Sequence, residues 1–309
     1  MFDFTIITPV FNGGEYLRQT IESVLSNAFD SSYEYIVVND GSTDETSRIL
    51  EDFKGKVKVI NQQNSGEANA VNAGLKTALG KWALIVSADD PLISKELFHD
   101  SKNLFESHPN LAVIYPDWNV IDENGETTET KFVQDYAFEK LFSEFNCLPG
   151  PGSIFNIEFA LLIGGRNPKY RYVSDYDFWL RMSQKGSFLH LPKVLAQWRS
   201  HPQSTSISSK GLQMGMERIS VIKDFLTLFP QEKKLKNKAL AHAYYNAALL
   251  GYFSKEVPAQ KWILKALYFG KGRISAGRTI VILYLLMLPF SKYLLATARL
   301  FGIGKAPKK

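Results

Sequence analysis

The stretch that decides the fold is TIITPVFNGGEYLRQTIESVL, residues 5–25. A β-rich run ends at Thr8, a loop with two glycines follows, and Tyr16, Ile21 and Val24 then recur at helical spacing. The same alternation continues to residue 115 and indicates an open, doubly wound α/β sheet. It predicts helices over 43–53 and 67–79 and strands at Phe4–Thr8, Tyr35–Val38, Val57–Ile60, Trp82–Val86 and Ala112–Tyr115.

The pattern changes twice further along the chain. Residues 116–209 combine shorter strands with Gly/Pro loops and one clear helix over 176–184, which reads as the second half of the same domain. A long amphipathic helix over 211–228 ends before Pro230, and segments 239–252 and 259–269 predict a helical hairpin. A length of 309 residues suits about two domains of ordinary size.

The last 79 residues are strongly basic. Residues 231–309 carry 15 Lys and Arg against 2 acids, whereas the first 230 carry 21 against 29. The uncharged run TIVILYLLMLPF, residues 279–290, is shorter than the roughly 20 residues of a bilayer span. It fits an amphipathic segment on an anionic membrane surface, with a buried C-terminal helix as the alternative. Nucleic acid is not an expected partner, because the lysines alternate with Leu, Ile, Tyr and Trp262.

Cysteine content and the first residues bear on the compartment. Cys147 is the one cysteine and cannot form an internal disulfide. The first ten residues show no basic stretch followed by an apolar one, so we expect no secretory signal. The expected location is cytoplasmic, peripheral on the cytoplasmic face of the membrane.

Three acidic clusters fall at the places where a sheet of this class binds ligands, outside the carboxyl ends of its strands. They are NDGSTD (39–44), SADD (87–90) and SDYD (174–177). Each alone is a plausible turn or helix cap. Three clusters at one edge repel each other unless they bind a cation or share protons, and this favours a ligand site.

Five motifs in this order resemble the family 2 glycosyltransferases, over about residues 3–205: TPVFNGGEYLRQTIESVL, YEYIVVNDGSTDET, NSGEANAVNAGLKTALGKWALIVSADD, GSIFNIEFALLIGG and SDYDFWLRM. The resemblance implies a GT-A fold, a Rossmann-like mixed α/β sheet. The expected catalytic domain is 1–210. The helical pattern and the basic, apolar composition predict a helical, membrane-proximal region over 211–309. Within the domain, 1–115 is the nucleotide-sugar half and 116–210 the acceptor half.

The resemblance also implies an activity. Members transfer a sugar from a nucleotide diphosphate sugar, here with UDP favoured, to an acceptor hydroxyl with inversion at the anomeric carbon. The expected acceptor is a saccharide or a lipid-linked saccharide, in surface polysaccharide or lipid-linked glycan synthesis. The expected cofactor is Mn²⁺ or Mg²⁺, which neutralises the leaving diphosphate while bound by one or two carboxylates.

Site residues follow from the same resemblance. Asp175 matches the general base that takes the acceptor proton, and a single displacement needs one such base. Metal binding is implied for Asp89, Asp90 and His201. Contacts to the nucleotide sugar are implied for Thr8, Pro9, Asn12, Asp40, Gly66, Asn72, Asp89 and Arg199.

The sequence departs from the family pattern at three positions. Ser87 stands where many members have the first Asp of the metal motif, Ser174 where many have Glu, and Val71 where many have Arg. A catalytically impaired nucleotide-sugar binding protein is therefore the alternative. A nicotinamide dehydrogenase is excluded, because no GxGxxG follows Ile7. A nucleotidyltransferase would need lysine in the first loop, which has none.

Overall fold

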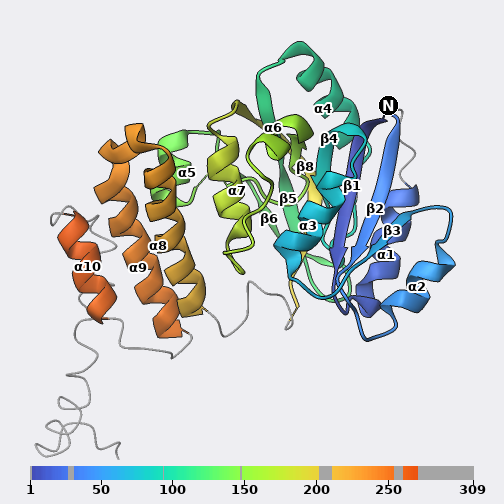
Figure 1. Cartoon of the computed structure of the whole chain (residues 1–309), viewed down its shortest axis with the longest axis horizontal. Coiled ribbons are helices and arrows are strands. Elements are labelled where there is room, and N and C mark those ends of the chain that lie inside the picture. Colours follow the sequence, from blue (N-terminus) through green and yellow to red (C-terminus); the bar gives the residue numbers. More distant parts are fainter. Residues whose placement is uncertain are drawn as a thin grey trace, which may run out of the picture. The chain divides into compact units, whose positions relative to one another are not determined.

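The structure is a computed structural model that describes residues 2–26, 31–92, 94–146, 148–201, 211–253 and 260–270. These residues belong to two compact units, 1–208 and 209–309. Figure 1 shows the order of the elements along the chain. The strands are β1 (Phe2–Val10), β2 (Tyr33–Asn39), β3 (Lys58–Asn61), β4 (Gly80–Ile85), β5 (Leu111–Ile121), β6 (Thr127–Lys131), β7 (Ile154–Asn156) and β8 (Ser187–Arg199).

Helices separate most of these strands and make up the described part of the second unit. In the first unit they are α1 (Gly14–Ser26), α2 (Thr46–Asp52), α3 (Glu67–Lys76), α4 (Glu96–Ser107), α5 (Phe138–Glu144), α6 (Ile157–Leu162) and α7 (Ser174–Met182). In the second unit they are α8 (Gly211–Leu228), the 3₁₀ helix η2 (Pro230–Leu235), α9 (Lys236–Phe253) and α10 (Gln260–Gly270).

The eight strands form one mixed sheet in the order β3-β2-β1-β4-β7-β5-β6, with β8 paired to β5. Strands β1 to β4 run parallel, as the sequence predicts. The fifth predicted strand, 112–115, is part of the longer β5 and joins this parallel group only across β7, which is antiparallel to both β4 and β5. β8 then runs parallel to β5. The mixed α/β sheet of the GT-A fold is therefore confirmed.

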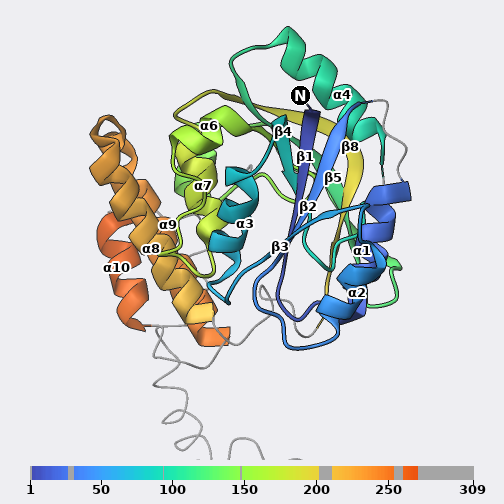
Figure 2. The ribbon, with the colours of Figure 1, turned by 45° about the vertical axis from the view of Figure 1, so that its right-hand side comes forward.

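The two faces of the sheet are covered by different helices (Figure 2). Because side chains alternate along a strand, Phe4 and Ile6 of β1 pack on one face with residues of α1, α2 and α4. Ile7 points to the other face, where α3 approaches so closely that a Cβ at Gly74 would lie 2.6 Å from its Cγ2. Helices on both faces leave the ends of the strands as the place for a ligand.

The described part of the second unit consists of packed helices. Glycines let α8 approach α9, because a Cβ at Gly215 would lie 2.6 Å from the Cα of Ala247. On α10, Trp262 and Phe269 stack against Tyr244 of α9, with ring centroids 5.9 and 5.5 Å apart. These helices coincide with the predicted amphipathic helix and hairpin.

The predicted membrane-associating segment, 279–290, lies outside the described residues. Within the residues that the structure describes, none of the helices combines the length and the apolar character that a bilayer crossing requires.

Candidate functional site

The loop after β1 is joined to the loop after β2. Asn12 has a positive φ of 54°, and its Oδ1 accepts a hydrogen bond of 2.8 Å from the amide of Thr43. Its own amide donates to Oγ of Ser42 at 3.0 Å. Thr8 lies below this loop with no exposed surface, and its hydroxyl is 3.0 Å from that of Tyr35, whose pKa is raised by burial. Pro9 is half-buried in the same strand.

Asp40 holds the start of α3. Its side chain is buried, Oδ1 accepts from the amide of Ser65 at 2.9 Å and from Nε2 of Gln62 at 2.6 Å, and Oδ2 accepts from the amide of Gly66 at 2.8 Å. Gly66 has a φ of 90°, a conformation that side chains disfavour. A carboxylate that accepts several amide bonds fixes the shape of the loop around it. Asp40 therefore shapes the rim of the site beside the end of β2.

The two carboxylates of the SADD cluster have different environments. Asp90 is buried, and its Oδ1 accepts a hydrogen bond of 2.7 Å from the amide of Arg199. Its pKa is raised, mainly by burial and also by the negative charge of Asp89. Asp89 keeps 31% of its side-chain surface exposed, and its Oδ2 lies 2.9 Å from Nε2 of His201. Asp89 thus faces solvent next to a histidine, whereas Asp90 binds the backbone.

Arg199 is fully buried at this end of the sheet. Its Nε donates to the carbonyl of Asp89 at 2.9 Å, Nη2 to Oε1 of Gln19 at 2.7 Å, and Nη1 to the carbonyls of Asp122 and Glu123, each at 3.0 Å. The guanidinium also lies over the ring of Tyr16. Arg199, predicted to contact the nucleotide sugar, instead uses its side chain to hold four segments of the chain together around Asp89.

The donor atoms for a divalent cation are few. Among the residues that the structure describes, no three His, Cys, Asp or Glu side chains are grouped as a metal site. Asp89 and His201 place one oxygen and one nitrogen 2.9 Å apart beside exposed surface. A carboxylate and an imidazole can bind Mn²⁺ when a substrate and water supply the other ligands. The fit extends to these two side chains and not to Asp90, whose Oδ1 is used by Arg199.

Asp175 lies at the start of α7. It is half-buried, and its Oδ1 accepts the amide of Tyr176 at 2.7 Å. Asp177, two residues on, has another role: its Oδ2 accepts from Nε and Nη2 of Arg181 at 2.9 and 2.5 Å. Of the two acids in the SDYD cluster, only Asp175 therefore remains available for a ligand.

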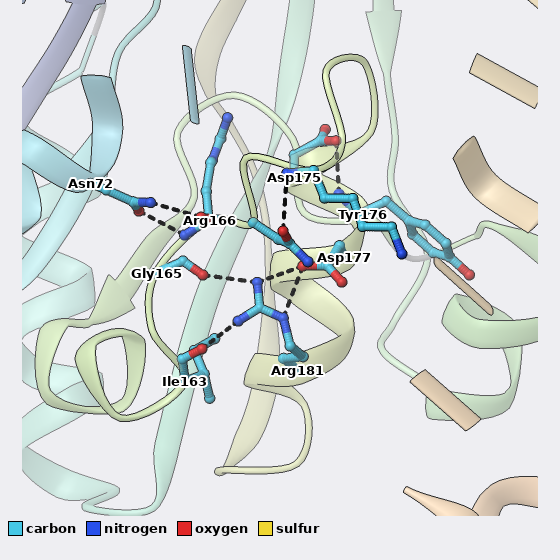
Figure 3. A network of polar contacts seen from close by, with 10 residues as sticks. Asn72, Ile163, Gly165, Arg166, Asp175, Tyr176, Asp177 and Arg181 are labelled. Carbon is cyan, nitrogen blue, oxygen red and sulfur yellow. Dashed lines mark hydrogen bonds and ion pairs between the residues drawn. The ribbon is translucent and has the colours of Figure 1, made fainter. Parts of the chain in front are cut away.

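A network of polar contacts fixes the loop that precedes α7 (Figure 3). Arg181 donates to the carbonyls of Ile163 and Gly165 at 2.6 and 2.8 Å. The side chain of Asn72 on α3 makes a pair of bonds with the backbone of Arg166, donating to its carbonyl at 2.7 Å and accepting from its amide at 2.8 Å. Asn72, predicted to contact the nucleotide sugar, thus contacts the loop of the second half in this structure.

Sequence reasoning missed Arg181 and Arg166. Arg181 could have been found, because an Asp four residues before an Arg on one helix is a common ion-pair spacing. Arg166 follows the glycine pair of the fourth motif, and its contacts with α3 span 94 and 99 residues. Such distant contacts leave no local pattern.

The sequence is similar to those of known glycosyltransferases. Residues 5–160 match the family model described as glycosyl transferase family 2. An uncharacterised glycosyltransferase of Rickettsia prowazekii is 29% identical over 246 residues, which cover 78% of this chain and 76% of that protein. A chondroitin synthase of Escherichia coli is 27% identical over 213 residues, covering 68% of this chain and 30% of the synthase.

Solved structures show the same fold. TarS of S. aureus superposes with a TM-score of 0.62 and 20% identity over 94% of this chain and 54% of TarS. A mannosyltransferase of Pyrobaculum calidifontis, solved with GDP-Man and Mn²⁺, gives a TM-score of 0.51 and 13% identity over 98% of this chain and 88% of its own.

The close approach of Gly165 to Asn72 leads to a stability prediction. Gly165 has a φ of 71°, and a Cβ there would overlap Oδ1 of Asn72, whereas Gly164 has a φ of 80° and open space. Gly165→Ala should cost about 3 kcal/mol of unfolding free energy, from backbone strain plus a lost clamp, and Gly164→Ala about 1 kcal/mol. Urea unfolding of both variants measures the difference, and equal losses would show that the Asn72 clamp contributes nothing.

Proposed function

The chain belongs to glycosyl transferase family 2, and from this premise we propose that it transfers a sugar from a nucleotide diphosphate sugar to an acceptor hydroxyl, with inversion at the anomeric carbon. One observation carries the proposal. Asp89 and Asp175 are only partly buried, while the acids beside them, Asp90 and Asp177, are buried and bonded within the protein. An inverting transfer needs these two functions, one carboxylate for a metal-bound diphosphate and one for a proton.

UDP is the proposed donor nucleotide. TarS has been solved with UDP and with UDP-GlcNAc, although at 16–17% identity this likeness shows the fold alone. The loops of Asn12 and Asp40 form the proposed base-binding rim, with Gly66 at the start of α3. Thr8 and Pro9 support that rim from β1. The buried hydroxyl of Thr8 already has a partner in Tyr35, so we assign the polar contacts to Asn12 and to backbone groups.

Asp175 is the proposed general base. The bond from the Tyr176 amide orients one carboxylate oxygen and leaves the other to accept the proton of the acceptor hydroxyl. The Arg181 and Asn72 clamps hold the preceding loop and so limit the motion of this carboxylate. With one fixed base on the acceptor side, the acceptor oxygen would attack the sugar in a single displacement. A single displacement inverts the anomeric carbon.

Asp89 and His201 are the proposed ligands of Mn²⁺ or Mg²⁺. A bound cation neutralises charge on the leaving diphosphate. The 2.9 Å contact between Oδ2 of Asp89 and Nε2 of His201 keeps the two donor atoms together, while Asp90 and Arg199 fix the backbone that carries both side chains.

The test of the function is a turnover assay with Asp175→Asn. Loss of the base should reduce transfer about 10²- to 10⁴-fold. UDP affinity should stay within about twofold, because the base acts on the acceptor hydroxyl and not on the nucleotide. Glu158→Gln, an exposed acid on α6, is the control. If the native chain binds UDP-sugar and transfers nothing to any saccharide acceptor, the binding-protein alternative is correct.

Metal dependence gives a separate prediction. His201→Ala should weaken Mn²⁺ binding in the presence of UDP about 10- to 100-fold, because one ligand of the cation is lost. Calorimetric titration with Mn²⁺ measures this, and EDTA should abolish native turnover until Mn²⁺ is restored. The matched control is His108→Ala, an exposed histidine at the end of α4. Unchanged Mn²⁺ affinity in His201→Ala would place the cation elsewhere.

The basic C-terminal region supports a proposal about location, at the cytoplasmic face of an anionic membrane and near a lipid-linked or polysaccharide acceptor. Each basic residue near such a surface contributes on the order of 1 kcal/mol, and the apolar run 279–290 adds to this. The full chain should sediment with anionic vesicles and be partly released by high salt. A chain that ends at Gly272 should stay in solution. Equal sedimentation of the two would contradict the proposal.

A further inference from the structure

Arg166 has a fixed backbone. Its amide and carbonyl are both bonded to the side chain of Asn72, and the carbonyl before it, that of Gly165, accepts from Arg181. Its position in the chain, between α6 and α7, is thereby tied to α3 on one side and to α7 on the other. These backbone contacts fix the position of the Arg166 Cα and therefore the region that its side chain can reach.

The guanidinium of Arg166 is buried with few partners. The residue is only 8% exposed, its Nη1 donates to Oε1 of Glu67 at 2.5 Å, and its Nε is buried without a hydrogen-bond partner. Glu67 supplies the one hydrogen bond that the guanidinium makes to the residues described by the structure. The Glu67 side chain is 56% exposed, so its charge is well screened by water.

The other two buried arginines of this domain are bonded very differently. Arg181 reaches a carboxylate and two backbone carbonyls, and Arg199 reaches three carbonyls and an amide oxygen. A guanidinium has five N–H donors, and a buried donor left without an acceptor costs about 1 to 3 kcal/mol. Arg181 and Arg199 therefore have the contacts of structural cations, whereas Arg166 has donors and charge left for an anion.

The side chain of Arg166 points toward the ligand end of the sheet. Its backbone lies beside Asn72, and its guanidinium reaches Glu67, five residues earlier on α3 and so roughly 7 Å nearer the start of that helix. Glu67 directly follows Gly66, whose amide is held by Asp40. Figure 3 shows the Arg166 side chain and the Asp175 carboxylate extending toward the same side of the network.

These positions identify the part of a donor that would lie there. The rim of Asp40 and Gly66 is the proposed place of the base, and Asp175 the proposed place of the reacting sugar carbon, so the diphosphate must lie between them. We propose that Arg166 binds the diphosphate of the donor nucleotide through its guanidinium, which is buried and has only the screened Glu67 as counter-charge. This inference rests on the proposed function. It gives the diphosphate a cationic partner in the second half of the domain, in addition to the metal.

The test compares nucleoside, monophosphate and diphosphate binding by calorimetry. Native protein is titrated with uridine, UMP and UDP, each with and without Mn²⁺. Arg166→Gln should weaken UDP binding about tenfold and uridine binding less than twofold, and Arg166→Lys should lie between. Arg171→Gln, an exposed arginine of the same loop, should bind all three as the native chain does. Unchanged UDP affinity in a folded Arg166→Gln overturns the inference, as does an equal loss for uridine.

A second variant keeps the inference testable if Arg166→Gln does not fold. Glu67→Gln removes the competing negative charge at an exposed position, and we expect several-fold tighter UDP binding with unchanged uridine binding. Weaker or equal UDP binding would contradict the inference. Failure of the proposed nucleotide-sugar binding looks different, because native protein would then bind no uridine, guanosine or thymidine diphosphate, whatever residue 166 is.

Discussion

One hydrogen bond joins strand β8 to the SADD cluster (87–90), and the geometry of the candidate site depends on it. The backbone amide of Arg199 donates to Oδ1 of Asp90 at 2.7 Å, across 109 residues of sequence. The Arg199 side chain extends the joint to the carbonyls of Asp89, Asp122 and Glu123. Because His201 is two residues further on, this joint brings its ring to Asp89. A buried carboxylate next to another acid is costly, and the charged, hydrogen-bonded Arg199 offsets that cost.

A second set of contacts holds the loop that precedes α7. The buried pair of Asp177 and Arg181 fixes the carbonyls of Ile163 and Gly165, and Asn72 fixes residue 166. Removing one partner of such a pair leaves the other charge buried, so both members depend on each other. These contacts tie α3 of the first half to α7 of the second. They thereby set where Asp175 stands relative to the loops after β1 and β2.

Much of the fold could be predicted from the sequence, because its signals are local. Strands β1 to β4 are apolar runs bounded by turns, and the alternation with helices indicates their parallel order. β7 could not be predicted, because three residues show no period, and its place between β4 and β5 depends on long-range pairing. The same holds for the division among the acids. Nothing local distinguishes Asp89 from Asp90, since burial by distant residues decides their roles. Asp177 differs from Asp175 in one local signal, the i,i+4 spacing to Arg181.

The way the acids are divided explains why a cluster of carboxylates is stable at one edge of a sheet. Asp40 is stabilised by hydrogen bonds from amides of the loop before α3, and Asp90 by a hydrogen bond from the amide of Arg199. Asp177 is paired with the guanidinium of Arg181. Each of these three carboxylates is therefore stabilised by hydrogen bonds, and each helps to connect two segments of the chain. The two carboxylates that remain, Asp89 and Asp175, come from segments of the first unit that are far apart in the sequence. The loops around them hold two partly buried carboxylates at defined places, which is the arrangement that the proposed metal-assisted transfer to a hydroxyl requires.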